Sequence, residues 1–482
     1  MENEKYIPTI GLEIHAELST KSKMFCSCKN DPDEEKPNIN VCPICLGHPG
    51  TLPVLNKEAI KNVLKIGLAV NGKLADFTEW DRKNYFYPDI PKGYQISQYK
   101  YPLVSDGELA GVALERIHLE EDTAQSTHDQ HEKSLVNFNR SGVPLMELVT
   151  KPVIHDAETA TQFAQELQLL LRYLGAGEAN LEKGEMRVEA NISVSSPADM
   201  KAGKFGTKTE VKNLNSFRSV GRAIEYEIKR QIKAIESGEK VIQETRGWDD
   251  NAGETYSQRV KEGSADYRYF PDPDIPKMKI SEVPEFAKAN LEKNMPELPW
   301  TKRDRFKKDF AMTDKEVEVF IDSPILAAYY ESITASYKND PKRVKLTTNY
   351  LLSDYLGLLK ARKQAFEAKT AIAASAFAEL IQMIAAGDIS SSAAKKILGF
   401  MIEDTASSPK QLADTHGLIQ KSDPASIAPI IDQVLKDNEK AIAEYKAGKA
   451  ASLQFLIGMS MKAAKGAANP EIIKKLLLEK LG

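Results

Sequence analysis

Alternation of apolar and polar residues is clearest near the start of the chain, over Ile10–Leu18. A period of two is typical of a β-strand, so the pattern predicts one face carrying Glu13, His15 and Glu17 and an opposite apolar face. Ordinary strands with one face in water show the same pattern, and from this stretch alone a half-solvated strand is the commoner outcome. If the polar face is covered, its carboxylates and imidazole need partners or a metal ion.

A second alternating stretch, Gly111–Asp122, ends in three consecutive carboxylates. Strand geometry sends Glu121 to one face and Glu120 and Asp122 to the other. An acidic triplet at a strand end is usually a solvated turn, so this pattern alone assigns it no role.

A single carboxylate, Glu147, lies inside the apolar run Val143–Val149. Burying a carboxylate is costly unless it is paired or bound to a metal ion. Glu147 is therefore the most informative single residue outside the first strand.

Helical periodicity predicts a few helices among these strands. The helices are expected at about Lys57–Val70, Ala157–Leu174 and Phe217–Glu236, and further strands at Met186–Ser193 and Thr209–Phe217. Strands mixed with helices, without regular βαβ alternation, indicate an α+β fold with a mixed or antiparallel sheet over residues 1–294. From Met295 onward, Ala-, Lys- and Leu-rich helical periods predict an all-helical middle domain at 295–407 and a small helical tail domain at 408–482.

Composition limits the classes of function. The chain has 482 residues, 28% of them charged and 42% hydrophobic, which is ordinary for a soluble globular protein. The net charge of −4 gives no overall basic field, so any contact with RNA must be local. The tail carries 11 Lys against 8 Asp and Glu, which gives it a net charge of +3. This charge fits equally well with a surface that binds a polyanion and with a helix face that only contacts solvent. We find no signal peptide and no apolar run of about 18 residues, so a cytoplasmic protein is expected.

The four cysteines form two close pairs, in the pattern C-x-C, thirteen residues, C-x-x-C. They are Cys26, Cys28, Cys42 and Cys45, and residues 26–45 are called the cysteine loop below. Four thiolates so spaced can surround a tetrahedral Zn²⁺, and closed four-cysteine sites are structural. Disulfides would need an oxidising compartment, and a redox C-x-x-C would not need the second pair, so a structural zinc site is predicted.

The segment Trp80–Tyr94 combines aromatic residues, prolines and cations, and is predicted to be loop-like. Aromatic residues at this density are most often only packing. Cations placed between them, such as Lys83 beside Tyr85, and Lys92, more often mark an anionic ligand or a nucleotide base.

The chain contains no G-x-x-x-x-G-K-[ST] loop, no G-x-G-x-x-G after a strand and no H-E-x-x-H motif. It offers instead Glu13 and His15 on the first predicted strand, with Glu121 and Glu147 on separate ones. Sites rich in oxygen with one imidazole suit Mg²⁺ or Mn²⁺, usually together with substrate phosphates.

Six motifs closely resemble, in this order, the B subunits of tRNA-dependent (glutamyl-/aspartyl-tRNA) amidotransferases. They are Gly11–His15, Asp81–Asp89, Leu119–Asp122, Asn139–Leu145, Lys212–Ser216 and Asp266–Pro271. The resemblance runs essentially from end to end, and the tail resembles a small helical module that the family shares with freestanding proteins.

The resemblance implies a two-step ligase reaction on mischarged tRNA, with glutamine as the amide-nitrogen donor. ATP phosphorylates the side-chain carboxylate of Glu-tRNA(Gln) or Asp-tRNA(Asn), and ammonia then displaces the phosphate. A separate amidase (A) subunit and a small C subunit are implied as partners in a heterotrimer. The tRNA would be bound by the catalytic cradle, residues 1–294, and by the tail.

By matching motif positions, the resemblance implies that His15, Glu121 and Glu147 are ligands of Mg²⁺, with Glu13 beside them, and that all four act in catalysis. The implied cofactors are ATP, Mg²⁺ and structural Zn²⁺.

The same matching places Lys83, Lys92 and Arg140 near phosphates or at the mouth of an ammonia path. Lys83 and Lys92 are thereby assigned to catalysis, Arg140, Lys83 and Tyr85 to nucleotide contact, and Glu189 to the lining of the path.

Two other functions fit the same residues. One is a zinc-containing RNA-binding scaffold without chemistry, against which the lone Glu147 in an apolar run argues. The other is a metal-dependent phosphohydrolase that uses the same carboxylates. The sequence does not say which of the two mischarged tRNAs is used.

Overall fold

The computed structural model describes residues 5–128, 133–260, 267–420, 424–464 and 468–482. It divides the chain into two compact units, Met1–Pro299 and Trp300–Gly482. The first is built around a large sheet and the second is helical, which confirms the α+β fold class. Asp266, which opens one of the six motifs, lies outside the described residues.

The predicted first strand, β1 (Ile7–Glu17), lies in the interior of the sheet. It pairs antiparallel with β11 (Pro144–Thr150) on one side and β12 (Met186–Ser195) on the other. In the described part of the chain the sheet has ten strands. Beyond β12 come β13 (Thr209–Leu214), β14 (Glu244–Asp249) and β15 (Glu254–Val260), and beyond β11 come β8 (Val112–Glu121), β6 (Val104–Ser105) and β2 (Lys73–Leu74), with β7 (Glu108–Leu109) paired to β8. Only the β13–β14 pair is parallel among the described ladders of this sheet.

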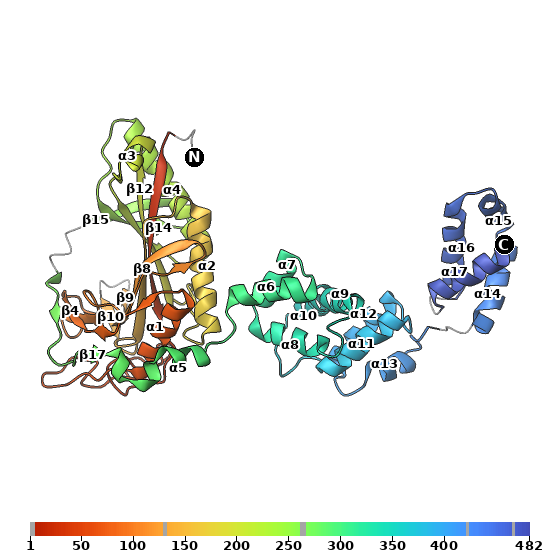
Figure 1. Ribbon diagram of the computed structural model, residues 1–482, viewed down its shortest axis with the longest axis horizontal. Coiled ribbons are helices and arrows are strands. Elements are labelled where there is room, and N and C mark those ends of the chain that lie inside the picture. The colour runs from red at the N-terminus through yellow and green to blue at the C-terminus, as the bar shows by residue number, and fades with distance from the viewer. Residues whose placement is uncertain (1–4, 129–132, 261–266, 421–423, 465–467) are drawn as a thin grey trace. The chain divides into compact units, whose positions relative to one another are not determined.

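Helices α2 (Ala157–Tyr173) and α4 (Phe217–Glu236) cover one face of the sheet (Figure 1). Each begins where the sequence predicts, because a side chain caps it: Asp156 accepts a hydrogen bond from the Thr159 N–H, and Ser216 from the Ser219 N–H. The apolar face of β1 is fully buried beneath these helices. The polar face of β1 therefore points to the opposite side of the sheet.

The prediction that Trp80–Tyr94 is loop-like is wrong at both ends of the segment. Residues Asp81–Asn84 form β4, and Tyr94–Ser97 form β5. Together with β16 (Phe270–Pro271) they make a three-stranded sheet. Strand β4 pairs with β5 on one edge and with the distant β16 on the other, so pairing between strands supplies the hydrogen bonds without a local alternating pattern.

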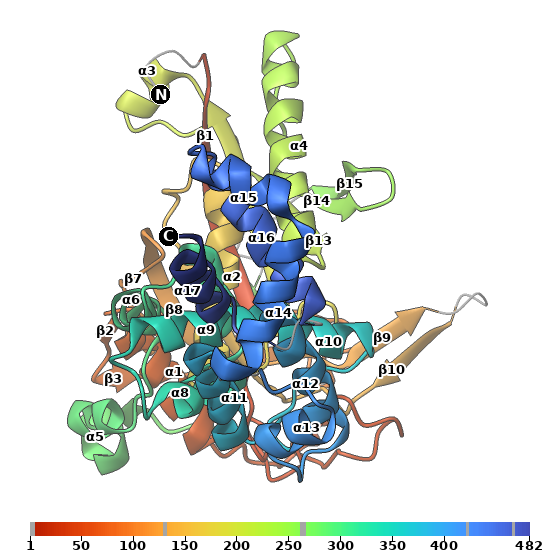
Figure 2. The ribbon, with the colours of Figure 1, turned by 90° about the vertical axis from the view of Figure 1, so that its right-hand side faces the viewer.

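Several smaller elements complete the first unit. They are α1 (Lys57–Ala69), the paired β3 (Phe77–Thr78) and β17 (Met278–Lys279), α3 (Pro197–Lys201), the 3₁₀ turns Ile280–Glu282 and Pro284–Phe286, and α5 (Lys288–Lys293). The hairpin of β9 (Gln125–His128) and β10 (Ser134–Asn137) projects from the large sheet in Figure 2.

The second unit consists of helices and one π-helical stretch, η4, among the described residues. In order they are α6 (Pro299–Phe310), α7 (Asp314–Ile321), α8 (Pro324–Thr334), α9 (Pro341–Asn349), η4 (Tyr350–Tyr355), α10 (Leu356–Ala361), α11 (Ala374–Ala386), α12 (Ser391–Glu403), α13 (Pro409–Thr415), α14 (Pro424–Asp437), α15 (Glu439–Lys446), α16 (Ala450–Ala463) and α17 (Pro470–Leu481). Helices α14–α17 surround an apolar core of their own, while the domain boundary at 407/408 stays a prediction. Within the described ranges, every helix falls short of the length and apolar character needed to cross a bilayer.

Candidate functional site

The register of the large sheet brings polar residues from separate strands onto one face. His15 on β1 lies directly opposite Glu147 on β11, and Glu147 lies opposite His118 on β8. On the other side of β1, Glu13 lies opposite Glu189 of β12. Residues that face each other across antiparallel strands point to the same side of the sheet. These side chains therefore gather on the face opposite α2 and α4.

Two histidines and two glutamates form the centre of this face, and we call them the histidine–glutamate cluster: His15, His118, Glu120 and Glu147. The Glu147 Oε2 atom lies 3.4 Å from His15 Nε2 and 3.2 Å from His118 Nε2. Carboxylate oxygens of Glu120 lie 3.6 Å from His15 Nε2 and 3.8 Å from His118 Nε2. Both carboxylates are buried, so their charge is compensated by these imidazoles rather than by water.

The mutual pairing shifts the pKa values of all four groups. Burial alone would lower the pKa of His15 and of His118, but the charges and hydrogen bonds of Glu147 and Glu120 outweigh it and raise both to about 9. Burial would raise the pKa of Glu147, and the two histidines instead hold it well below its usual value. The pKa of Glu120 is likewise lowered against burial, through His118 and Lys83.

The donor set of this face fits a divalent cation. Ligand atoms of Glu13, His15 and Glu147 lie within 4.8 Å of one another, and so do those of His118, Glu120 and Glu147. An octahedral ion that holds its ligand atoms at about 2.0–2.1 Å needs those atoms to lie as close to one another as they do here. Glu120 Oε2 is buried without a hydrogen-bond partner among the described residues, which leaves it available to a cation. Burial and the charges of Glu147 and Glu189 raise the pKa of Glu13, a repulsion that a bound cation would relieve.

The structure does not bring Glu121, a predicted metal ligand, to His15 and Glu147. Strand alternation sends it to the other face of β8, where it lies opposite Pro144. Its carboxylate accepts hydrogen bonds from Lys92 Nζ at 2.8 Å and from the Ile96 N–H at 3.0 Å. Its neighbour Glu120 takes the place in the cluster. The side chains of Glu13, His15 and Glu147 lie together on one face of the sheet, as expected. Matching motif positions did not show which of the adjacent residues Glu120 and Glu121 shares that face.

His118 and Glu120 were not predicted as site residues from the sequence. The sequence contained a signal for them, because alternation along β8 places His118 and Glu120 on the same face, and Glu120 was already assigned to the face away from Glu121. What was lacking was the register between β8, β11 and β1, which decides which of the two faces meets Glu147.

Lys83 on β4 lies beside the histidine–glutamate cluster. Its ammonium lies 5.8 Å from the ring centre of Tyr85 and 5.1 Å from that of Tyr267. Burial would lower its pKa, but the charges of Glu120 and Glu147 and the nearby tyrosines raise it. Among the described residues, no carboxylate forms an ion pair with it within 4.0 Å. Its positive charge is therefore held by aromatic rings and remains available to an incoming anion.

The other predicted cations are already paired. Lys92 forms an ion pair with Glu121 at 2.7 Å. The Arg140 guanidinium donates to the carbonyl oxygens of Thr123 and Ala124, each at 3.0 Å, and lies 3.7 Å from Asp122.

Two further predicted residues are also bonded. Glu189 accepts a hydrogen bond from Lys212 at 2.7 Å. The Tyr85 hydroxyl donates to Gln95 Oε1 at 3.2 Å, and burial raises the Tyr85 pKa.

A cavity of about 220 Å³ lies between the cysteine loop and the Lys92–Glu121 pair. Its wall includes Cys26, Cys45, Lys92, Tyr94 and Glu121. The face of β8 away from the histidine–glutamate cluster thus borders this cavity, of which the cysteine loop forms one side.

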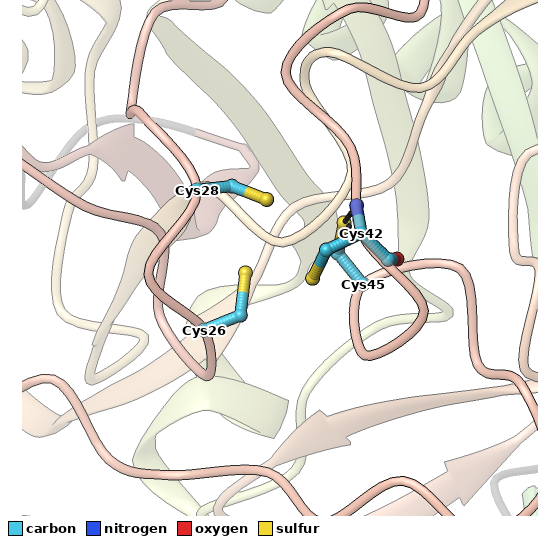
Figure 3. A group of neighbouring side chains, drawn as sticks. All are labelled: Cys26, Cys28, Cys42 and Cys45. Atoms are coloured by element: carbon cyan, nitrogen blue, oxygen red, sulfur yellow. Dashed lines mark hydrogen bonds between the residues drawn. The ribbon is translucent and has the colours of Figure 1, made fainter.

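The four cysteines converge in Figure 3, and their sulfur atoms lie within 4.8 Å of one another. Tetrahedral Zn²⁺ with Zn–S bonds of about 2.3 Å requires sulfur atoms about 3.8 Å apart, so the set fits this ion. All four are free cysteines. A hydrogen bond from Cys26 and a backbone N–H lower the pKa of Cys45 to about 5, against burial. The donor set therefore suits the structural metal site that the spacing predicts.

The cysteine loop is joined to the segment before β11 by a fully buried asparagine, Asn139. Its Oδ1 accepts from the N–H groups of Ile39 and Asn40, each at 3.0 Å, and its Nδ2 donates to the Lys36 carbonyl at 2.8 Å. The loop is thereby tied to the stretch that carries Arg140 and leads into the strand of Glu147.

Replacing Asn139 by Ala is expected to lower the free energy of unfolding by about 3 kcal/mol, because two backbone N–H groups and one carbonyl lose their partner. Urea unfolding should show a lower midpoint with an unchanged slope. Asn40→Ala is the matched control, since that side chain makes one long hydrogen bond of 3.4 Å. An N139A variant as stable as N40A would contradict the role of Asn139 in holding the cysteine loop to the segment before β11.

Comparisons with known proteins show the family of this chain. The family model for the GatB/GatE catalytic domain matches residues 8–284, and the model for the GatB domain matches residues 328–481. The chain is 41% identical to the B subunit of the aspartyl/glutamyl-tRNA(Asn/Gln) amidotransferase of Crocosphaera subtropica, over 98% of this chain and 97% of that protein. The corresponding protein of Thermodesulfovibrio yellowstonii is 42% identical over 98% and 99%, and that of Persephonella marina 40% over 99% and 100%. The chain therefore belongs to the family of aspartyl/glutamyl-tRNA(Asn/Gln) amidotransferase B subunits, as its six motifs predict.

Proposed function

We propose that this chain forms Gln-tRNA(Gln), Asn-tRNA(Asn) or both from the corresponding mischarged tRNA. ATP first phosphorylates the side-chain carboxylate of the attached Glu or Asp, and ammonia then replaces the phosphate. The observation that carries this proposal is the buried histidine–glutamate cluster, with Lys83 beside it, on one face of the sheet.

The first step needs charge neutralisation more than a general base. A substrate carboxylate is already ionised at pH 7, so no proton has to be removed from it. The carboxylate and the triphosphate repel each other, and the reaction requires both to be held in line. Lys83 supplies a positive charge that no described carboxylate pairs with at close range, and this supports a place for it beside the transferred phosphate.

We infer that His15, Glu120 and Glu147 hold Mg²⁺, with Glu13 and His118 beside them. When bound, the ion would neutralise phosphate charge and orient the nucleotide. Glu120 replaces Glu121 in this proposed ligand set, because Glu120 shares the face of His15 and Glu147. Arg140 and Tyr85 are retained as proposed nucleotide contacts.

Ammonia must come from outside the site described. We propose that an amidase A subunit with a small C subunit delivers it, in a heterotrimer with this chain. The cavity beside Lys92 and Glu121 supports an ammonia path that begins on that side of β8. Glu189 lies opposite Glu13, on the face of the histidine–glutamate cluster, and is proposed to line the end of the path that reaches this cluster. The tRNA is proposed to bind the first unit and the basic tail, in the cytosol where tRNA is charged.

One assay tests the proposal and its rivals together. The full chain, alone and with its A and C partners, is given ATP, Mg²⁺, ammonium and each mischarged tRNA in turn. We expect amide formation with ammonium, dependent on ATP, and use of glutamine only when the partners are present. RNA binding without ATP turnover would favour a scaffold, and phosphoester cleavage without tRNA would favour a phosphohydrolase; either result would overturn the proposal.

Replacing Lys83 by Met is expected to lower kcat/KM for ATP-dependent amidation by about 100-fold, the usual cost of removing one charge-stabilising group. Lys100→Met is the matched control, because Lys100 is exposed and contacts only the Tyr101 ring among the described contacts. Single-turnover formation of the phosphorylated intermediate is the measurement. Equal rates for the two variants would remove Lys83 from the site.

A further inference from the structure

Lys23 is a fully buried lysine next to the cysteine loop, with a relative exposure of 0%. Lysine is almost never fully buried unless it is paired. The backbone of Lys23 is fixed on both sides: its N–H donates to the Cys28 carbonyl at 3.0 Å, and its own carbonyl accepts from Asn56 Nδ2 at 3.1 Å. The side chain therefore has little freedom to reach water.

The ammonium has two close partners. It donates to the Phe138 carbonyl at 3.1 Å and lies 4.0 Å from Cys45 Sγ. Across the described part of the chain, no carboxylate pairs with it within 4.0 Å. A neutral carbonyl satisfies a hydrogen bond but does not balance a buried positive charge. The charge balance has to come from the cysteines.

A metal complex of the four cysteines has the charge that is needed. Zn²⁺ with four thiolates carries a net charge of −2, and the sulfur atoms converge as such a complex requires. Cys45 is the most buried of the four, with 3% exposure, and its sulfur already accepts a hydrogen bond from the Cys42 N–H at 3.1 Å. An excess negative charge at this buried sulfur and an unbalanced ammonium beside it stabilise each other.

We propose that Lys23 is the counter-charge of the cysteine metal site, acting through Cys45 and linking that site to the segment at Phe138. The proposal rests on the cysteine geometry and is independent of the amidation proposed above. Its rival is that Lys23 only ties two loops together through its hydrogen bond to Phe138. A substitution can separate the charge of Lys23 from its hydrogen bond to Phe138, because glutamine can donate to a carbonyl without carrying a charge.

The test uses the full chain with Lys23→Met and Lys23→Gln, and Lys21→Met as an exposed control two residues away. Co²⁺ titration, read by its thiolate charge-transfer absorption, and competition with Zn²⁺ give the metal affinity without any activity assay. We expect both Lys23 variants to bind about 10–100-fold more weakly, the usual effect of losing a group that supports metal ligands. K21M should bind as the unsubstituted chain does.

A K23Q variant with unchanged affinity would overturn the proposal, because a tether alone would then suffice. Unchanged affinity in K23M would overturn it as well. Thermal unfolding in saturating Zn²⁺ provides the second measurement. Met has a similar length and no charge to bury, so K23M should stay folded, and unfolding of both variants under these conditions would also contradict a counter-charge role.

Discussion

Glu147→Gln should abolish ATP-dependent amidation while the fold remains, with a loss of at least about 100-fold in rate. Glutamine keeps the shape of the side chain and one acceptor oxygen, but it removes the negative charge that both histidines and Arg116 face. Without that charge the site binds a divalent cation poorly and cannot neutralise the phosphates. Product formation with mischarged tRNA, ATP and ammonium is the measurement, together with Mn²⁺ binding followed by electron paramagnetic resonance.

Glu115→Gln is the matched control for this variant, since Glu115 is an exposed glutamate on β8. Circular dichroism and tRNA binding should be unchanged in both variants. The buried histidines of E147Q lose a partner, so a small loss of stability is expected, and assays belong well below its Tm. A fully active E147Q, or equal loss of activity in E115Q, would remove Glu147 from the site.

Cys42→Ser is expected to release the metal ion and to destabilise the first unit by about 4 kcal/mol, a size typical of a lost structural metal. For a unit of this size each kcal/mol corresponds to about 2–4 °C in Tm, so a fall of about 10 °C is expected. The physical reason is that the cysteine loop has few apolar contacts of its own and relies on the ion and on Asn139 for its shape.

Zinc content by atomic absorption and thermal unfolding test this expectation. Ser27→Ala is the control, because Ser27 is exposed and lies between two cysteines without belonging to the sulfur cluster. Chelation of the unsubstituted protein should reproduce the C42S result. Equal zinc content and equal Tm in C42S and S27A would show that the four cysteines hold no structural metal.

The cysteine loop links these predictions to one another. It forms a wall of the cavity beside Lys92 and Glu121, and Asn139 joins it to the segment that leads into the strand of Glu147. Metal loss should therefore disturb the proposed ammonia path before it disturbs the histidine–glutamate cluster, which β1, β8 and β11 hold independently.

Local patterns in the chain were enough to predict the elements that depend on neighbours a few residues away. The alternation of β1 and the helical periodicity of α2 and α4 are local signals, and the structure has those elements where the sequence predicts them. The family also followed from the sequence, because its six motifs are short and contiguous.

Which side chains meet depends instead on contacts between distant segments. Glu120 rather than Glu121 joins His15 and Glu147, because register between strands more than twenty residues apart sets the face, and a shift of one residue exchanges the faces. Strand β4, at the Trp80 end of Trp80–Tyr94, likewise pairs with the distant Phe270–Pro271, and the buried ammonium of Lys23 has its acceptor in the distant Phe138 carbonyl. Pairings between distant segments leave no periodic trace in the sequence, so the polar contacts that make the site could not be read from it.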